Sequence, residues 1–314
     1  MRTAFIETLL DLAEHDARIW LLCGDLGYSV LERFAGRFPD RFVNVGVAEQ
    51  NMTGVAAGLA LCEKIVFTYS IANFPIMRCL EQIRNDVCYH GLNVNIVAVG
   101  GGWAYGSQGY THHALEDLAV MRAMPNMQVI APGDPLETRL ATRAIVEWPG
   151  PCYLRLGKAG EPNIHETGIQ LEIGHVIRMR SGTDALMISI GGMLQTTLAA
   201  VESAAQLGVS VAVWSSPSLK PLDTQAIVAA ATQYPLIMTV EEGNVNGGLG
   251  SAVAEVLAAM PHPRARLIRV GIPEDMILSS AYSQLAARCQ VGLTAQQLCG
   301  HLVAEVTMAS VATG

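Results

Sequence analysis

The chain has few charged side chains and no long apolar run. Only 15% of its 314 residues are charged, whereas 51% are hydrophobic. No uninterrupted apolar segment reaches the roughly 18 residues that a membrane-spanning helix requires. Because so apolar a chain without a membrane span has much surface to remove from water, we expect part of that surface to be buried against another chain.

An excess of basic charge and an export signal are also missing. The net charge of −8 argues against non-specific binding of nucleic acid. The amino terminus lacks the apolar core of a signal peptide, since Glu7 and Asp11 interrupt it, so we expect a cytoplasmic protein. Seven cysteines are scattered without a C-x-x-C pair or a matching histidine spacing, which predicts reduced thiols rather than a disulfide framework or a metal site.

The hydrophobic pattern predicts strands that alternate with helices in two series, separated by a polar, turn-rich segment over 157–174. Near-continuous apolar strands are typical of a parallel sheet covered on both faces. The sequence therefore predicts an α/β fold with two doubly wound domains, each with a mostly parallel sheet covered by helices. The expected strands are 19–23, 41–45, 65–69, 94–99, 127–130, 152–156, 185–190, 209–214 and 236–240, and the expected helices include 52–60, 77–89, 115–124, 134–146 and 193–207.

A single acid, Glu49, lies where the strand over 41–45 runs into the helix over 52–60. That helix is nearly free of charge, so we expect it to be buried. A carboxylate at such a junction is either a helix-start residue favoured by the helix dipole or a functional acid in a dry environment. Position alone leaves both interpretations open.

Two further motifs are weaker candidates for ligand binding. The glycine-rich segment 243–250 lacks the G-x-G-x-x-G spacing of a dinucleotide site, so glycines that let a helix start pack closely on the sheet explain it better. Asp25 follows a strand, but residues 28–40 offer no evident further ligands for magnesium. We therefore favour a structural or substrate-edge role for Asp25 and expect no metal ligand in this chain.

The loop over 100–113 is a stronger candidate. It is long and rich in glycine, and it follows a strand, so it lies at the sheet edge where α/β proteins bind ligands. It ends in His112 and His113, whose side chains should point in different directions. The two histidines are either solvated capping residues or, together with an acid, an aromatic residue and a lysine at other strand ends, part of a substrate site.

Taken together, several segments resemble the second half of a transketolase, in the order in which that family has them. The resemblance implies a pyrimidine-binding domain over 1–160, a linker over 161–174 and a transketolase C-terminal domain over 175–314. It also implies thiamine diphosphate as the cofactor. The segments that carry it are Gly46–Gly58, Thr68–Phe74, Gly109–His113, Met121–Met127, Ala131–Asp134 and Leu219–Asp223.

The resemblance implies roles for residues around the cofactor and the reaction. Glu49 stands where the family's glutamate hydrogen-bonds N1′ of the aminopyrimidine and shares a proton with it, which requires a dry pocket. Phe74 is expected to stack on that ring, although a core role for it stays open because the aromatic spacing differs from the family pattern. Tyr69 is also expected to contact the cofactor. His112 matches a histidine that contacts donor-substrate hydroxyls and relays protons.

Three more residues are implied to bind substrate. Lys158 falls where the family commonly has an arginine that binds the substrate phosphate, with a solvated linker lysine as the alternative. Arg2 matches a second phosphate-binding arginine more weakly. Gln108 stands where typical transketolases have an aspartate, and Gly100 replaces a histidine or aspartate, so the stereochemistry of the substrate stays open.

The diphosphate-binding domain of the family, with its Gly-Asp-Gly and a downstream Asn that hold magnesium, has no counterpart in this sequence. Since the family also occurs split into two polypeptides, the resemblance implies a partner subunit that holds Mg²⁺ and the diphosphate, in an α2β2 assembly. We expect a transferase that moves a two-carbon ketol unit between sugar phosphates only with that partner. The alternatives are the β subunit of a 2-oxo-acid dehydrogenase, a deoxyxylulose-phosphate synthase-like enzyme and a non-catalytic scaffold subunit.

Overall fold

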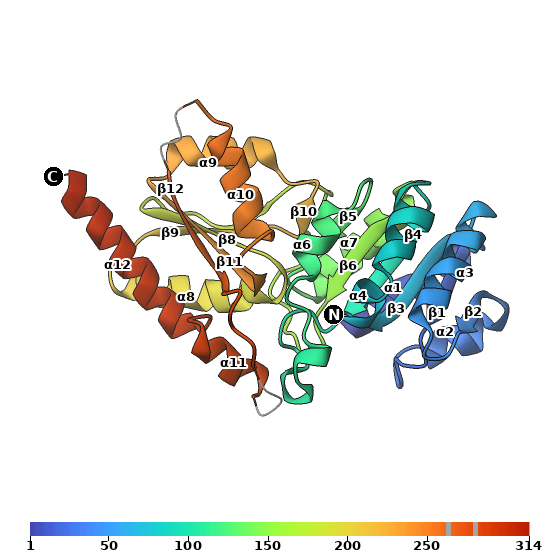
Figure 1. The fold of residues 1–314 in the computed structure, drawn as a ribbon. Helices are drawn as coiled ribbons and strands as arrows, with labels where there is room; N and C mark the ends of the chain where they lie inside the picture. The colour runs from blue at the N-terminus through green and yellow to red at the C-terminus, as the bar shows by residue number, and fades with distance from the viewer. Residues whose placement is uncertain (262–264, 279–281, 314) are drawn as a thin grey trace.

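The computed structural model describes residues 1–261, 265–278 and 282–313, and it contains two sheets (Figure 1). The first has seven strands in the order β10-β5-β6-β4-β3-β1-β2, and six of them come from the first half of the chain. These six pair in parallel. The strands are β1 (Ile19–Cys23), β2 (Phe42–Asn44), β3 (Ile65–Ile71), β4 (Val94–Val99), β5 (Gln128–Ile130) and β6 (Cys152–Leu156).

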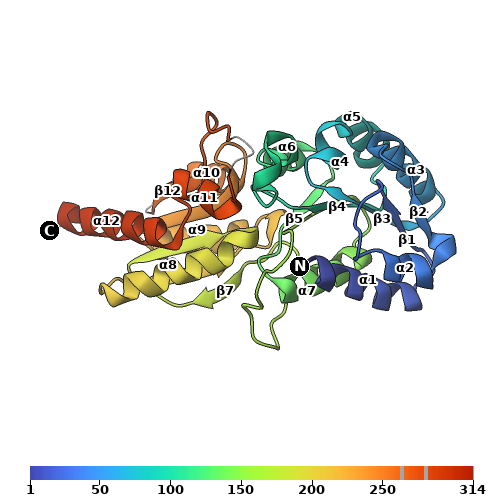
Figure 2. The ribbon, with the colours of Figure 1, turned by 90° about the horizontal axis from the view of Figure 1, so that it is seen from below.

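Helices cover both faces of this sheet. Figure 2 shows α1 (Arg2–His15), α2 (Glu32–Arg37) and α7 (Pro135–Glu147) below it. The opposite face carries α3 (Glu49–Leu61), α4 (Phe74–Met77), α5 (Leu80–Gln82), a π-helical turn (Ile83–Cys88) and α6 (Asp117–Ala123). Residues alternate between the two faces along each strand, so that Phe67 packs towards α1 whereas Val66 packs towards α3. The predicted parallel sheet with helices on both sides is confirmed.

The second sheet has five strands in the order β12-β11-β8-β9-β7. Its core is parallel, and β7 is an antiparallel edge. Helices α8 (Leu194–Gln206), α11 (Gln284–Gln290) and α12 (Ala295–Thr313) pack on one face, while α9 (Thr224–Gln233) and α10 (Leu249–Ala258) pack on the other. The strands are β7 (Ile177–Arg180), β8 (Ala185–Ser189), β9 (Val211–Ser215), β11 (Leu236–Asn244) and β12 (Arg266–Ile272).

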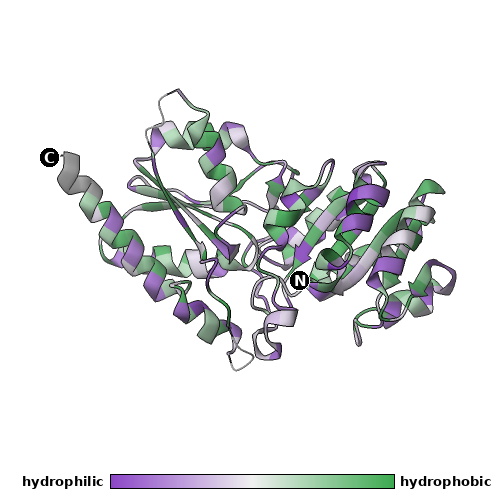
Figure 3. Ribbon diagram, viewed as in Figure 1, coloured by the Kyte–Doolittle hydropathy of each residue, from purple (hydrophilic) through white to green (hydrophobic). Residues whose placement is uncertain are grey.

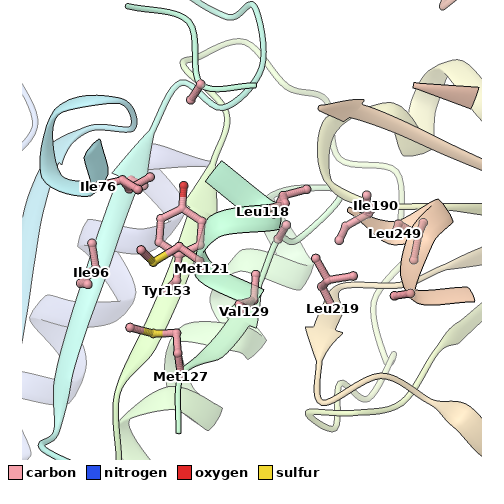
Figure 4. Packing of buried hydrophobic residues seen from close by; sticks show 14 of the residues in the cluster. Ile76, Ile96, Leu118, Met121, Met127, Val129, Tyr153, Ile190, Leu219 and Leu249 are labelled. Carbon is pink, nitrogen blue, oxygen red and sulfur yellow. The ribbon is translucent and has the colours of Figure 1, made fainter. Parts of the chain in front are cut away.

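The two halves share one core. The short strand β10 (Ser218–Lys220) belongs to the second half but pairs antiparallel with β5 of the first sheet. Around it a single buried cluster crosses the junction, and Figure 4 shows Leu118 and Val129 of the first half beside Leu219 and Leu249 of the second. Residues 157–176 form neither helix nor strand. The domain bounds 1–160, 161–174 and 175–314 stay a prediction.

Two local predictions are wrong. The helix over 52–60 was expected to be buried. In the single chain, however, one side of α3 is exposed to solvent, including Asn51, Val55 and Leu61. The exposed positions are uncharged, which is why the pattern suggested burial, but they combine Asn51 and two glycines with the apolar Val55 and Leu61. The helix expected over 77–89 instead begins at Phe74 and breaks at Arg78, before α5 and the π-helical turn.

No described helix combines the length and the hydropathy needed to cross a membrane.

Candidate active site

Glu49 is the first residue of α3, where its side chain is only 1% exposed. The left-handed backbone of Gly46 (φ 74°) lets the chain turn from β2 into this helix. The carboxylate has one hydrogen-bond partner among the described residues: Arg78 Nη1 donates to Oε2 over 2.9 Å. Oε1 accepts no hydrogen bond from any described residue and lies beside Gly24, at the carboxyl end of β1. Glu49 thus offers one free carboxylate oxygen in a sheltered position.

Arg78 is a site residue that the sequence reasoning missed. Besides its ion pair with Glu49, its guanidinium carbon lies 4.9 Å from the centre of the Phe74 ring. Phe74 and Arg78 are four residues apart, the spacing at which helical side chains meet. A buried acid generally needs a compensating charge, and this requirement together with the spacing could have indicated Arg78.

The glycine-rich loop brings His112 to the same place. The His112 ring lies 5.1 Å from the Phe74 ring, centre to centre, in an edge-on contact. Asn73 Nδ2 donates to the carbonyl oxygen of Thr111 over 2.7 Å, which ties the loop to the start of α4. Burial lowers the pKa of His112, and the neighbouring His113 lowers it further. A neutral imidazole at this position can accept a proton as well as a hydrogen bond.

Tyr105 continues the row of contacts, and sequence reasoning missed it too. Its ring centre lies 6.3 Å from that of His112, and Lys158 Nζ lies 4.7 Å above its ring. Gly100 (φ 84°) makes room for it, because a Cβ there would come within 2.1 Å of the ring. The predicted residues Glu49, Phe74, His112 and Lys158 are therefore connected through Arg78 and Tyr105.

Tyr69 and Arg2 lie apart from Glu49, Phe74 and His112 but near Tyr105, whose pKa the charge of Arg2 affects. Tyr69 points to the α1 face of the sheet, where its ring stacks on Phe5 at 6.2 Å. Burial raises its pKa to about 12, although the charge of Arg2 nearby counteracts part of that rise. Among the residues that the structure describes, the buried Tyr69 hydroxyl and Arg2 Nε find no hydrogen-bond partner. The structure thus pairs two predicted residues with each other but brings neither to Phe74.

Gln108 and the second histidine have different surroundings. Gln108 is exposed, and its backbone N–H donates to the Tyr105 carbonyl oxygen over 2.8 Å. His113 is buried, with Nε2 at 3.1 Å from the carbonyl oxygen of Gly106, so the two adjacent histidines do point in different directions. Figure 3 shows this loop, between β4 and α6, as mostly neutral or hydrophilic.

The second half of the chain holds the base of the loop. An isolated bridge pairs Gly102 with Ala114. The Trp103 N–H donates to Glu242 Oε1 over 2.9 Å, and Arg155 Nη2 donates to the carbonyl oxygens of Ala114 and Glu242, both at 2.9 Å. Both ends of the loop segment 102–114 are therefore fixed to the junction between the two halves.

Neither of the weaker motifs joins the site. Asp25 exchanges hydrogen bonds with Asn44, which supports a structural role. In the segment 243–250, a Cβ on Gly248 would come within 1.8 Å of Glu241 Oε2, so this glycine allows close packing at the start of α10. Among the residues that the structure describes, no three His, Cys, Asp or Glu side chains gather to hold a metal ion. The absence of a metal ligand from this chain stays a prediction.

Comparisons with known proteins identify the class to which this fold and site belong. Residues 1–160 match the family model of the transketolase pyrimidine-binding domain, and residues 174–298 match that of the transketolase C-terminal domain. The chain therefore belongs to the transketolase family, which confirms the resemblance drawn from its motifs.

Its relatives include single subunits of transketolases. A subunit of the apulose-4-phosphate transketolase of Phocaeicola vulgatus is 37% identical over 300 residues, which cover 95% of each chain. A subunit of the 6-deoxy-6-sulfo-D-fructose transketolase of a Clostridium species is 37% identical over 87% of this chain and 84% of its own. A solved split-gene transketolase, described as an inactive β4 tetramer, superimposes with a TM-score of 0.88 at 38% identity, covering 98% of this chain and 97% of that one.

The family implies dependence on thiamine diphosphate, and the residues present fit the pyrimidine end of that cofactor. Glu49 has a sheltered carboxylate oxygen without a hydrogen-bond partner among the described residues. Phe74 presents a half-buried ring beside the same guanidinium that holds Glu49. An acid and an aromatic ring at one place are suited to bind the edge and the face of a flat heterocycle.

Proposed function

We propose that this chain is the carboxyl-terminal subunit of a split transketolase. The enzyme would transfer a two-carbon ketol unit between a ketose phosphate and an aldose phosphate. The observation that carries the proposal is the buried Glu49 carboxylate beside Phe74 and His112. It occurs in a chain that aligns over nearly its whole length with one subunit of a two-part transketolase.

Each residue has a role in this proposal. Thiamine diphosphate, when bound, would supply the carbon nucleophile that a sugar carbonyl requires. Glu49 would share a proton with the pyrimidine nitrogen, and the ring of Phe74 would contact the cofactor. The cofactor contact of Tyr69 stays a prediction, since its buried ring packs on Phe5 and not beside Phe74. His112 would accept hydrogen bonds from substrate hydroxyls and relay protons, because its lowered pKa keeps it neutral near pH 7.

The substrate phosphate would bind near Lys158 and Arg2, two cationic side chains close to Tyr105. Lys158 has an exposed ammonium group above Tyr105. Burial raises the pKa of Tyr105, and Arg2 lies close enough for its charge to offset part of that rise. A lysine binds phosphate as a point charge, whereas an arginine can also bind it with two parallel hydrogen bonds. Gln108, exposed on the same loop, would contact a hydroxyl of the sugar.

The proposal includes a partner subunit that carries the diphosphate-binding domain and Mg²⁺, in an α2β2 assembly. Exposed apolar side chains lie at both ends of α3, since Val47 (74% exposed) precedes the helix and Leu61 (65%) ends it, and Tyr28 (73%) is exposed on the loop after β1. Such a surface is suited to burial against another chain. The similar split-gene transketolase that is described as an inactive β4 tetramer also agrees with a need for a second kind of polypeptide.

The test compares the chain alone with the chain combined with the product of the neighbouring reading frame. Ketol transfer from a ketose phosphate should be negligible for the chain alone and appear on mixing with thiamine diphosphate and Mg²⁺. Glu49→Gln should assemble normally but lose activity by about two orders of magnitude or more. The exposed Glu147 at the end of α7 provides a matched control, because Glu147→Gln should leave turnover unchanged.

Three outcomes would contradict the proposal. Full turnover by the chain alone would remove the need for a partner. Release of carbon dioxide from a 2-oxo acid, without cleavage of a ketose phosphate, would favour a dehydrogenase or a deoxyxylulose-phosphate synthase-like enzyme. Unchanged turnover of Glu49→Gln would exclude the acid from the reaction.

A further inference from the structure

Arg78 is connected to both groups that would meet the cofactor ring. Its Nη1 donates to Glu49 Oε2 over 2.9 Å, and its guanidinium carbon lies 4.9 Å from the centre of the Phe74 ring. One cation thus donates to an acid and lies over an aromatic ring. No other described residue donates a hydrogen bond to that carboxylate.

Arg78 stands at the last helical position before the break. Helix α4 ends at Met77, Arg78 remains helical in backbone (φ −79°, ψ −15°), and Cys79 departs from it (φ −108°, ψ 6°). The buried Cys79 fixes the break against the core, while the Arg78 side chain is 46% exposed. The cation therefore reaches the buried acid from the solvent side.

The two oxygens of Glu49 consequently differ. Oε2 is held by Arg78, whereas Oε1 has no hydrogen-bond partner among the described residues. Oε1 lies 3.7 Å from the place that a Cβ of residue 24 would take, so Gly24 leaves that side of the carboxylate open. A carboxylate held at one oxygen loses rotational freedom and presents the other in a defined direction.

We propose that Arg78 is a positioning residue that sets the orientation of both Glu49 and Phe74. This inference rests on the proposed function, since it concerns how that site is prepared for the aminopyrimidine ring. A guanidinium suits the task better than an ammonium, because it is planar, donates from a fixed fork and stacks on aromatic faces.

The test measures the affinity for thiamine diphosphate, with Mg²⁺, of the assembled two-chain enzyme by calorimetry. Arg78→Met keeps an apolar stem but removes the charge and the donors, so we expect about tenfold weaker binding. Arg78→Lys keeps the charge but loses the fork and the flat face, so we expect a loss of a few fold. The turnover number should fall in the same order, whereas KM for the ketose phosphate should change by less than about twofold.

Arg84 provides the matched control. It is an exposed arginine on the π-helical turn, and its Nη1 donates only to the adjacent Asn85 among described residues. Arg84→Met should leave cofactor affinity, turnover and assembly unchanged.

Cofactor binding by Arg78→Met as tight as that of the native enzyme, or tighter, would overturn the inference, because the ion pair would then be dispensable or an obstacle. If Arg78→Met does not fold, Arg78→Lys decides: native affinity overturns the inference and a loss of a few fold supports it. Glu49→Gln distinguishes a failure of the proposed function from a failure of the role proposed for Arg78. An inactive Glu49→Gln together with a native-like Arg78→Met would refute the role of Arg78 alone, whereas an active Glu49→Gln would refute the proposed function.

Discussion

At the scale of single residues, two buried acids are stabilised in different ways. Glu49 is paired with the half-exposed cation Arg78. Glu241, which is 1% exposed, instead accepts hydrogen bonds from the backbone N–H groups of Leu249 and Gly250, at 2.9 and 2.8 Å. Burial raises the pKa of Glu241 to about 7, and these two hydrogen bonds offset only part of the rise. Glu241 therefore affects stability near neutral pH.

The pKa of Glu241 predicts that stability falls as pH rises from about 4.5 to about 7. The acid ionises near its ordinary value of 4.5 in the unfolded chain but only near 7 in the folded one. The stabilisation is therefore complete below pH 4.5 and is lost as pH rises through 7, with an upper limit of order 3 kcal/mol. Glu241→Gln has no proton to lose, so the difference in unfolding free energy between pH 4.5 and pH 8, measured in urea, should shrink.

Glu202 is the control for this experiment, since it is exposed on α8. Glu202→Gln should keep the pH dependence of the native chain. An equal pH dependence in Glu241→Gln would mean that other groups cause it.

At the scale of elements, two loops beside the site contain glycines that are required for different reasons: Gly100 between β4 and α6, and Gly160 between β6 and β7. Gly100 (φ 84°) lies against the Tyr105 ring. Gly160, near Lys158, has nearly the same backbone angle (φ 82°), but no atom of the described residues lies within 4 Å of the place that a Cβ would take. The two positions therefore separate backbone strain from the steric cost of displacing Tyr105.

Alanine at these two positions should have unequal effects. Gly160→Ala should lower the unfolding free energy by about 1 kcal/mol through backbone strain alone. Gly100→Ala should cost a further 1–3 kcal/mol or so, because the ring must move, and it should also reduce ketol transfer by the assembled enzyme. Thermal unfolding and activity assays on both variants test this. Equal losses in the two variants would show that the position of Tyr105 does not depend on Gly100.

At the scale of the whole molecule, Glu242 connects the two halves. Its carboxylate accepts hydrogen bonds from the Trp103 N–H of the first half and from Gln284 and Arg288 of α11. Glu242 is 4% exposed, and its ion pair with Arg288 is largely buried. Since a buried acceptor that loses its partners is costly, the junction and the base of the histidine loop should loosen together.

Glu242→Ala should lower the unfolding free energy by about 2–4 kcal/mol. It should also speed proteolytic cleavage within residues 103–113, because the Trp103 N–H loses its acceptor. Glu242→Gln keeps an acceptor oxygen but not the charge, so its loss should be intermediate. Glu202→Ala, a change at an exposed acid on α8, should alter neither quantity. Native cleavage rates in Glu242→Ala would show that the Gly102–Ala114 bridge and the hydrogen bonds from Arg155 and Asn73 hold the loop without Glu242.

Much of the fold could be predicted because it depends on local patterns. Strands β1, β4 and β6 lie where the apolar runs 19–23, 94–99 and 152–156 predicted them. The strand β10 could not be predicted, since its three residues have no pattern of their own and are ordered by pairing with β5. The break at Arg78 was missed for a similar reason, because it depends on how Cys79 packs in the core.

By itself, the sequence determined the class of fold, the family and the acid at the start of α3, because apolar periodicity and short motifs are properties of neighbouring residues. Only the tertiary structure decided what that acid contacts. Glu49 and Arg78 are 29 residues apart, and Trp103 and Glu242 are 139 apart. Contacts over such separations arise from the order of strands in a sheet and the packing of helices on it, which no local pattern encodes.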